Sequence, residues 1–160
     1  MISKKLCIYG LDSSFVEWIS CYLRDRHQTV WIDHLYSSFI ENSVGVPQGS
    51  ILGPLFFLIY FNDLPTVIDN EIECYADDST LSKSGDFIKQ ISDSLTSDCN
   101  SLDKWVKENY FKLNTQKTHF TVLGTSSKLK KNEETIKVSI EGNELTQSSQ
   151  KSEMLLGIKI

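Results

Sequence analysis

The sequence predicts an α+β fold in a single domain, and three observations point to it. Two stretches, 11–28 and 86–109, place apolar residues at helical intervals. Several short runs rich in β-branched and aromatic residues are joined by turn signals, which is the pattern of antiparallel hairpins. A chain of 160 residues is also long enough to bury a core of its own. Helices mixed with hairpins favour the α+β class.

In the first part of the chain, the helix expected over 11–28 begins with Ser14 and Glu17 at capping-box spacing. Short strands are expected at 29–32 and 37–42, with the residues between them as the connection. Among the large side chains of the helix, we expect Trp18 to lie in the core.

The segment 45–54, GVPQGSILGP, holds three of the eight glycines and two of the three prolines, so we expect a loop. Pro54 suits the first turn of the following helix, PLFFLIYFNDL, and Pro65 ends it. Because that helix is apolar on nearly every side, it is expected to be buried.

The second part of the chain begins with strand-like runs at 72–76 and 79–83, which form a hairpin with Asp77 and Asp78 at its tip. The helix over 86–109 has Asp86 as its expected cap, and Trp105 and Phe111 are expected in the core. The remaining expectations are a strand at 118–124, an exposed loop at 126–134, a hairpin at 135–147 that turns near Gly142 and Asn143, and a strand at 153–160.

Composition limits the function classes. The formal net charge is −5, which argues against a sequence-independent nucleic-acid binder, because such proteins usually display a basic face. The four cysteines are scattered with no C-x-x-C pair, so zinc or a disulfide framework is not expected. The longest apolar run, LFFLIYF, is too short to cross a bilayer. With no secretory signal in the first residues, an intracellular protein, cytoplasmic or nuclear, is the expectation.

The adjacent acids Asp77 and Asp78 have two interpretations. Two acids at a hairpin tip usually form a solvated turn. Alternatively, magnesium takes one or two carboxylates together with phosphate and water oxygens, and two such ions can clamp the attacking and leaving oxygens of a phosphoryl transfer. Strand ends are rigid places to hold such ligands. The surrounding residues decide between the two interpretations.

The stretch CYADDSTL resembles the Y-A-D-D box of reverse transcriptases. The stretch GVPQGSILGPLFFLIYFNDLP is similar to the segment that precedes this box in non-LTR retrotransposons. The resemblance extends to WVKENYFKLNTQKTHFTVLG and to LLGIKI, which looks like the start of the family's primer-grip strand. It implies a palm-type reverse-transcriptase subdomain, an antiparallel sheet with packed helices, over 1–160.

The resemblance also implies a site. It makes Asp77 and Asp78 metal-binding, catalytic carboxylates for Mg²⁺, with Mn²⁺ as the alternative, and places Lys117 near the triphosphate. The implied partners are an RNA template, a DNA primer and deoxynucleoside triphosphates, with no membrane. The residues implied to contact the nucleotide or template are Pro47, Gln48, Gly49, Tyr75 and Ala76.

One family feature has no counterpart here. The family carries a third catalytic aspartate on a strand well before the helix at 11–28, and Asp12, the only early candidate, is interpreted as a helix cap. We therefore expect a palm truncated at both ends, without fingers, first catalytic strand and thumb, and inactive alone. The alternatives are a non-catalytic palm remnant that binds nucleic acid or protein, and an unrelated magnesium nuclease or phosphatase.

Overall fold

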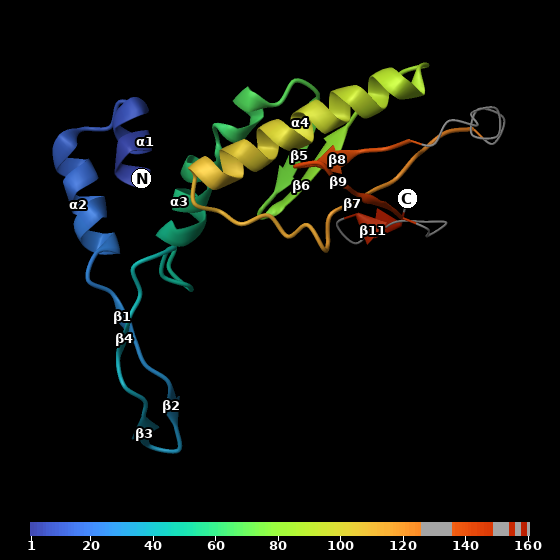
Figure 1. Cartoon of the computed structure of the whole chain (residues 1–160). Helices are drawn as coiled ribbons and strands as arrows, with labels where there is room; N and C mark the ends of the chain where they lie inside the picture. Colours follow the sequence, from blue (N-terminus) through green and yellow to red (C-terminus); the bar gives the residue numbers. More distant parts are fainter. Residues whose placement is uncertain (126–135, 149–153, 156–157, 160) are drawn as a thin grey trace. The chain divides into compact units, whose positions relative to one another are not determined.

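The computed structural model describes residues 1–125 and 136–148 together with the backbone of 154–155 and 158–159. The chain forms two compact units, Met1–Asp63 and Leu64–Ile160 (Figure 1). The expected loop at 126–134 lies outside the described residues.

The first unit is built on three helices, α1 (Ile2–Ile8), α2 (Ser13–Leu23) and α3 (Leu52–Phe61). Helix α1 was not predicted, because seven residues are too few to show a clear helical period. The helices meet in one apolar cluster, to which each contributes. Its buried members are Leu6, Val16, Ile19 and Phe56.

Helix α2 begins later and ends earlier than predicted. The Asp12 carboxylate caps it by accepting a 2.9 Å hydrogen bond from the Ser14 amide, which confirms Asp12 as a cap. The Ser14 hydroxyl donates to the same oxygen, and these hydrogen bonds lower the pKa of Asp12. Because Ser14 lies inside the helix, the predicted Ser14–Glu17 capping box was wrong.

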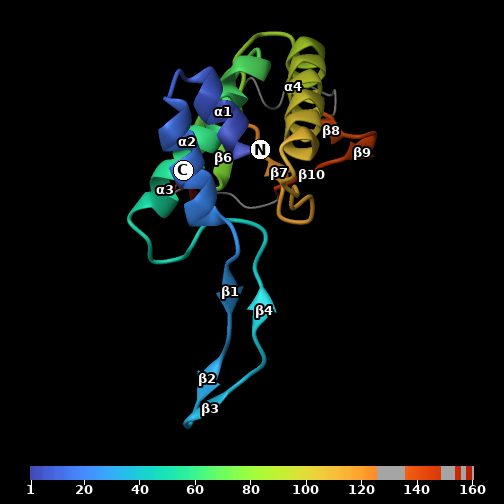
Figure 2. The same ribbon diagram turned by 90° about the vertical axis from the view of Figure 1, so that its left-hand side faces the viewer.

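A two-stranded arm leaves the helices of this unit after α2 (Figure 2). It pairs β1 (His27–Gln28) with β4 (Ile40–Glu41), and β2 (Trp31–Ile32) with β3 (Leu35–Tyr36), both antiparallel. The predicted hairpin is confirmed, although β3 lies in the predicted connection. The turn falls at Asp33 and His34, which both have positive φ.

The second unit contains the 3₁₀ turn η1 (Leu64–Val67), the hairpin β5 (Glu71–Tyr75) and β6 (Asp78–Ser82), and the long helix α4 (Ile88–Glu108). The hairpin and α4 lie close to their predicted positions, whereas η1 was not predicted. Helix α4 has Phe87 at its N-cap position instead of Asp86. One face of α4 is buried. Its buried residues are Asp98, Cys99, Leu102, Asp103, Trp105 and Val106.

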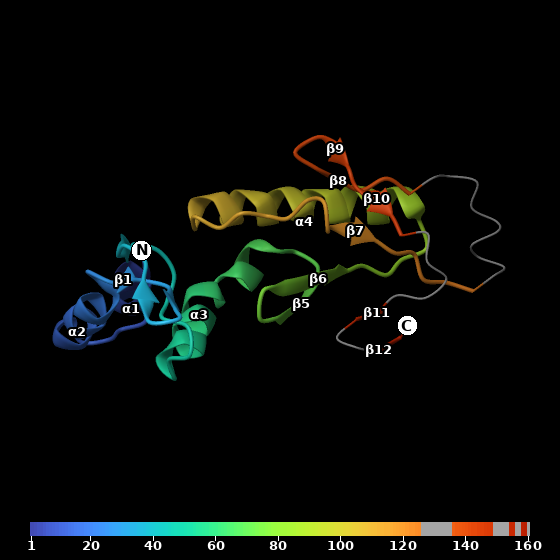
Figure 3. The same ribbon diagram turned by 90° about the horizontal axis from the view of Figure 1, so that it is seen from below.

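Short strands complete this unit (Figure 3). The hairpin β8 (Ser139–Ile140) and β9 (Asn143–Glu144) turns at Glu141 and Gly142, as predicted, and Val138 and Ile140 pack against Cys99 of α4. Strand β7 (His119–Phe120) pairs in parallel with β10 (Thr146–Gln147), and β11 (Met154–Leu155) with β12 (Ile158–Lys159) in antiparallel fashion.

These elements confirm a mixed class of helices and small sheets. The described strands form two-stranded ladders, of which β7–β10 is parallel, instead of the one antiparallel sheet that was predicted. The predicted final strand is likewise two short strands, with its other residues outside the described part.

Three burial predictions were wrong in part. Trp18 is 54% exposed and stacks on Phe15, which is itself 47% exposed, outside the core. Helix α3 buries Phe56 but leaves Leu58 62% exposed. Trp105 is in the core as predicted, whereas Phe111 is 37% exposed and stacks on it at 5.9 Å between ring centroids.

Candidate active site

The two aspartates lie at the tip of the β5–β6 hairpin. Tyr75 pairs with Asp78 as the last rung of the ladder, which leaves only Ala76 and Asp77 for the turn. Ala76 has φ of 51°, in the left-handed region that favours glycine. All four residues are exposed, so both carboxylates are open to solvent. The sequence predicted this hairpin tip, and the structure brings these four site residues together.

The hairpin has one strongly acidic face. Side chains alternate across a strand and directly opposed residues share a face, so Asp78 lies on the face of Tyr75, Glu73 and Glu71. The Ser82 hydroxyl donates to the Glu71 carboxylate at 3.3 Å. In the part of the chain that the structure describes, no three His, Cys, Asp or Glu side chains are grouped to hold a metal ion.

Pro47, Gln48 and Gly49 form a tight turn in the first unit. The Ser50 amide donates to the Pro47 carbonyl at 3.4 Å, and Gly49, the third residue of the turn, has φ of 78°. A positive φ at that position is what a type II turn requires, which explains the glycine. Gln48, the second residue of the turn, is exposed, so its side chain is accessible to a ligand.

Both ends of this loop are fixed by hydrogen bonds. The Arg26 guanidinium donates to the Val44 carbonyl at 3.0 Å and to the Gly45 carbonyl at 2.7 Å. At the other end, the Ser50 hydroxyl accepts from the Gly53 amide at 2.9 Å, at the start of α3. Neither role was predicted. Contacts from a side chain to a backbone carbonyl leave no signal in a single sequence, although Ser50 near a helix start is a recognisable cap signal.

Lys117 ends a second tight turn. Its amide donates to the Asn114 carbonyl at 3.1 Å and to the Asn114 side-chain oxygen at 3.3 Å, and the Thr118 amide donates to the same carbonyl. Asn114 therefore shapes the turn, and Lys117 is exposed. Among the described residues, no ion pair joins Lys117 to Asp77 or Asp78.

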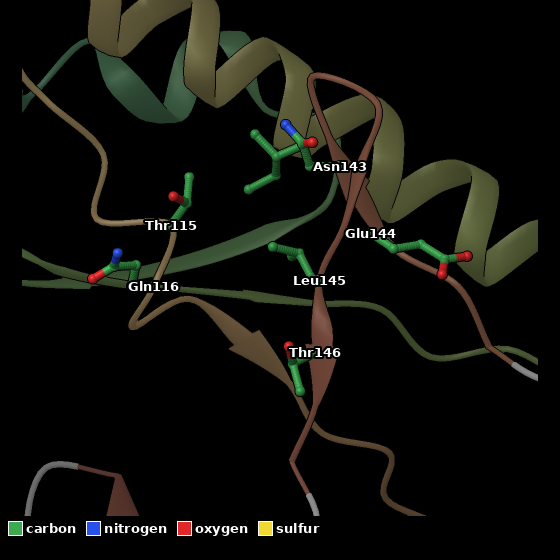
Figure 4. A pocket seen from close by; sticks show the side chains of 7 residues that line it. Thr115, Gln116, Asn143, Glu144, Leu145 and Thr146 are labelled. Carbon is green, nitrogen blue, oxygen red and sulfur yellow. The ribbon is translucent and has the colours of Figure 1, made fainter.

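A shallow pocket of about 210 Å³ lies beside this turn (Figure 4). Thr115 and Gln116, which immediately precede Lys117, line one side, and residues of β9, the following strand β10 and the link between them line the other. None of the residues predicted for the site lines it.

In the described part of the chain, no helix is both long and apolar enough to span a membrane.

Residues 3–160 match the family described as reverse transcriptase (RNA-dependent DNA polymerase). The chain belongs to the reverse transcriptase family. This confirms the family to which the Y-A-D-D box and the Pro-Gln-Gly loop pointed. Reverse transcriptases as a family use divalent metal ions, which is in keeping with an exposed pair of carboxylates.

Two relatives come from Drosophila melanogaster. The chain is 33% identical over 108 residues to the "Probable RNA-directed DNA polymerase from transposon BS" and 28% identical over 107 residues to the "RNA-directed DNA polymerase from mobile element jockey". Each match covers 62% of this chain and 12% of the relative, so the chain spans about an eighth of these reverse transcriptases. No solved structure matches the chain significantly.

Proposed function

We propose that residues 1–160 form the palm part of an RNA-directed DNA polymerase of a mobile element. Its substrates are an RNA template, a DNA primer and deoxynucleoside triphosphates. The observation that carries the proposal is the hairpin tip, where a two-residue turn presents Asp77 and Asp78 to solvent next to Tyr75 and Ala76. Family membership supports the reaction class.

Asp77 and Asp78 hold Mg²⁺, with Mn²⁺ as the alternative. Both side chains offer exposed oxygen ligands, Asp78 at the paired end of β6 and Asp77 in the turn before it, which fits the preference of magnesium for few carboxylates plus phosphate and water oxygens. Two bound ions supply charge neutralisation at the attacking and leaving oxygens of nucleotidyl transfer. The two aspartates would hold those ions at the hairpin tip.

The other site residues orient the substrates. Tyr75 and Ala76 back the incoming nucleotide and the primer end. Gly49 gives the template a close approach, because no atom lies within 4 Å of the place where a Cβ would stand, and Gln48 contacts the nucleic acid from the turn corner. Pro47 shapes that turn. The Lys117 ammonium lies by the triphosphate and donates a proton to the leaving pyrophosphate.

Residues 1–160 are not sufficient for polymerisation. The hairpin tip offers two carboxylates, and Asp12, the early candidate for a third, is used as the cap of α2. Catalysis of this kind depends on positioning and on charge neutralisation, so the loss of one metal-binding carboxylate is expected to reduce the rate severely. We expect no primer extension by the isolated chain on an RNA template with magnesium and all four deoxynucleotides. Robust, Asp77-dependent synthesis would contradict this part of the proposal.

A chimera tests the function directly. The chain replaces its matching segment in the jockey polymerase, and RNA-templated primer extension is measured for the parent chimera and for its Asp77→Asn, Asp78→Asn and Asp93→Asn variants. Asp93 is an exposed aspartate of α4 and serves as the matched control. Activity that is lost in the first two variants and kept in the control supports the proposal. Activity that survives Asp77→Asn and Asp78→Asn contradicts it.

A further inference from the structure

Asp98 is a buried carboxylate near the middle of α4 whose hydrogen-bond partners lie outside the helix. It is 1% exposed. It accepts hydrogen bonds from the Asp69 amide at 3.0 Å, the Asn70 amide at 3.0 Å and the Asn70 side-chain nitrogen at 2.6 Å. The same nitrogen donates to the Ser94 hydroxyl at 2.8 Å. We call these four residues the Asp98 clamp.

The Asp98 clamp holds the point where the acidic hairpin begins. Asn70 immediately precedes β5, the strand that leads to Tyr75 and the two aspartates. The other strand is held separately, because Leu81 of β6 packs on the cluster that contains Cys99, the neighbour of Asp98. The start of β5 is thus held on α4 by polar contacts, whereas β6 rests on an apolar cluster formed by Cys99 of α4 with Val138 and Ile140.

We propose that Asp98 is a positioning residue, which sets the orientation of the β5–β6 hairpin, and so of Asp77 and Asp78, relative to α4. The orientation itself follows from contacts within the second unit. Its consequence for metal binding rests on the proposed function.

The distances involved make orientation sensitive to the clamp. At about 3.3 Å per residue, the five residues of β5 put the hairpin tip about 16 Å from the clamp, so a tilt of about 5° moves the tip by more than ~1 Å. A displacement of about 1 Å at reacting groups can cost about 100-fold in rate. Within the residues that the structure describes, no third strand pairs with β5 or β6, so no neighbouring strand opposes such a tilt.

A carboxylate is the side chain that this place requires. Its two oxygens accept from two backbone amides and one side-chain amide, and the charge strengthens all three hydrogen bonds. Asparagine has nearly the same shape but only one acceptor oxygen, and its NH₂ group would face a donor. Asp98→Asn therefore loosens the clamp with little change in volume. Asp93→Asn, an exposed change on the same helix, removes the same charge and is the matched control.

The test compares the full chain with its Asp98→Asn, Asn70→Ala and Asp93→Asn variants. Residual dipolar couplings of backbone amides report how β5 and β6 are oriented relative to α4, without any metal. Thermal unfolding curves identify a temperature at which the parent and every variant are folded. A Mg²⁺ titration at that temperature, followed through the amide NMR signals of residues 75–78, gives the dissociation constant of Mg²⁺ at the hairpin tip.

We expect the hairpin and α4 to share one alignment in the parent and in Asp93→Asn. In Asp98→Asn, the residual dipolar couplings of β5 and β6 become smaller, or they no longer fit the alignment tensor of α4. Asn70→Ala removes one of the three hydrogen bonds to Asp98, so its hairpin couplings change in the same direction but by less. At a temperature where Asp98→Asn is fully folded, its dissociation constant for Mg²⁺ rises several-fold above that of the parent. If Asp98→Asn does not fold, the same two measurements on Asn70→Ala test the proposal.

A merely structural role predicts a different result. It predicts a lower unfolding temperature with the hairpin couplings and the Mg²⁺ dissociation constant unchanged in the folded protein, and that outcome overturns the proposal. If the parent chain binds no Mg²⁺ at residues 75–78 but the couplings change as expected, the positioning role stands and the proposed metal site fails. The two failures are therefore distinguishable.

Discussion

Tyr75 and Asp78 face each other as the last pair of the β5–β6 ladder, which confines the turn to Ala76 and Asp77. Asp78 therefore belongs to strand β6, whereas Asp77 lies in the turn. The tight turn also places a non-glycine residue in the left-handed region. Strained backbone of this kind is found at functional sites when the surrounding structure enforces it.

Replacing Ala76 by glycine is expected to stabilise the protein. Relief of the left-handed strain at φ of 51° outweighs the added chain entropy, for a net gain of about 0.5–1 kcal/mol in the free energy of unfolding. Urea denaturation measures it. Ser79→Gly, in the strand of the same hairpin, is the control and is expected to destabilise. A loss of stability in Ala76→Gly would show that the alanine side chain itself is required there.

Replacing Gly49 by alanine is expected to destabilise the first unit by about 1 kcal/mol, because alanine is strained at φ of 78°. No atom lies within 4 Å of the added Cβ, so the cost is that of the backbone alone. Gln48→Ala, at the exposed corner of the same turn, is the control and leaves the unfolding temperature nearly unchanged. Equal stability of the Gly49→Ala variant and the parent would rule out the turn described here.

Lys5 is expected to stabilise the first unit through its buried ammonium. Its Nζ donates to the Asp63 carboxylate at 2.7 Å and to the Tyr60 carbonyl at 2.6 Å, and lies 4.4 Å from the centre of the Tyr60 ring. Lys5→Met keeps the apolar stem and loses these contacts, so the free energy of unfolding is expected to fall by about 1–2 kcal/mol. The loss is not larger because Asp63 is partly exposed and can bind water instead.

Lys4→Met, at the exposed neighbouring position, is the matched control for this change. Thermal unfolding of both variants separates the loss of a charge from the loss of the contacts. Equal unfolding temperatures for the two variants would contradict the stabilising role of Lys5.

Cys99 is expected to resist alkylation in the folded protein. Burial, helped by the neighbouring charge of Asp98, raises the pKa of the Cys99 thiol to about 11. Cys7, Cys21 and Cys74 are exposed. Iodoacetamide at pH 8, followed by mass spectrometry, is expected to label these three and to label Cys99 only on unfolding. Rapid native labelling of Cys99 would contradict the packing of α4.

The same thiol gives a pH dependence. Because the folded state holds the proton up to about pH 11 and the unfolded state releases it near the ordinary value of 9.0, this contribution to stability is complete below pH 9.0 and is lost as pH rises to about 11. Cys99→Ala is expected to flatten the fall of the unfolding temperature across that range. An equally steep fall in Cys99→Ala would assign the pH dependence to other groups.

Much of the chain was predictable because local signals were strong. In the helix over 86–109, apolar residues recur at helical intervals over many turns, and the hairpin at residues 71–82 consists of two strand-like runs. The predicted bounds of both therefore agree with the structure to within a few residues. The cap role of Asp12 was also predictable from its place before a helix.

What the sequence left open depends on packing. An aromatic residue at a helical interval can stack outside the core, and Trp18 does so on Phe15. The parallel pairing of β7 with β10 joins segments far apart in the chain, for which no local pattern exists. Asp98 was part of a predicted helix, but only the fold shows that its partners are the amides before β5.

If the hairpin tip holds a divalent metal ion, Mn²⁺ must bind there. The decisive measurement is a titration of the full chain with Mn²⁺, followed by paramagnetic broadening of its amide NMR signals. We predict broadening centred on residues 75–78 that is displaced by Mg²⁺, abolished in the Asp77→Asn/Asp78→Asn double variant and retained in Asp93→Asn. Broadening centred elsewhere, or unchanged in the double variant, would contradict the account.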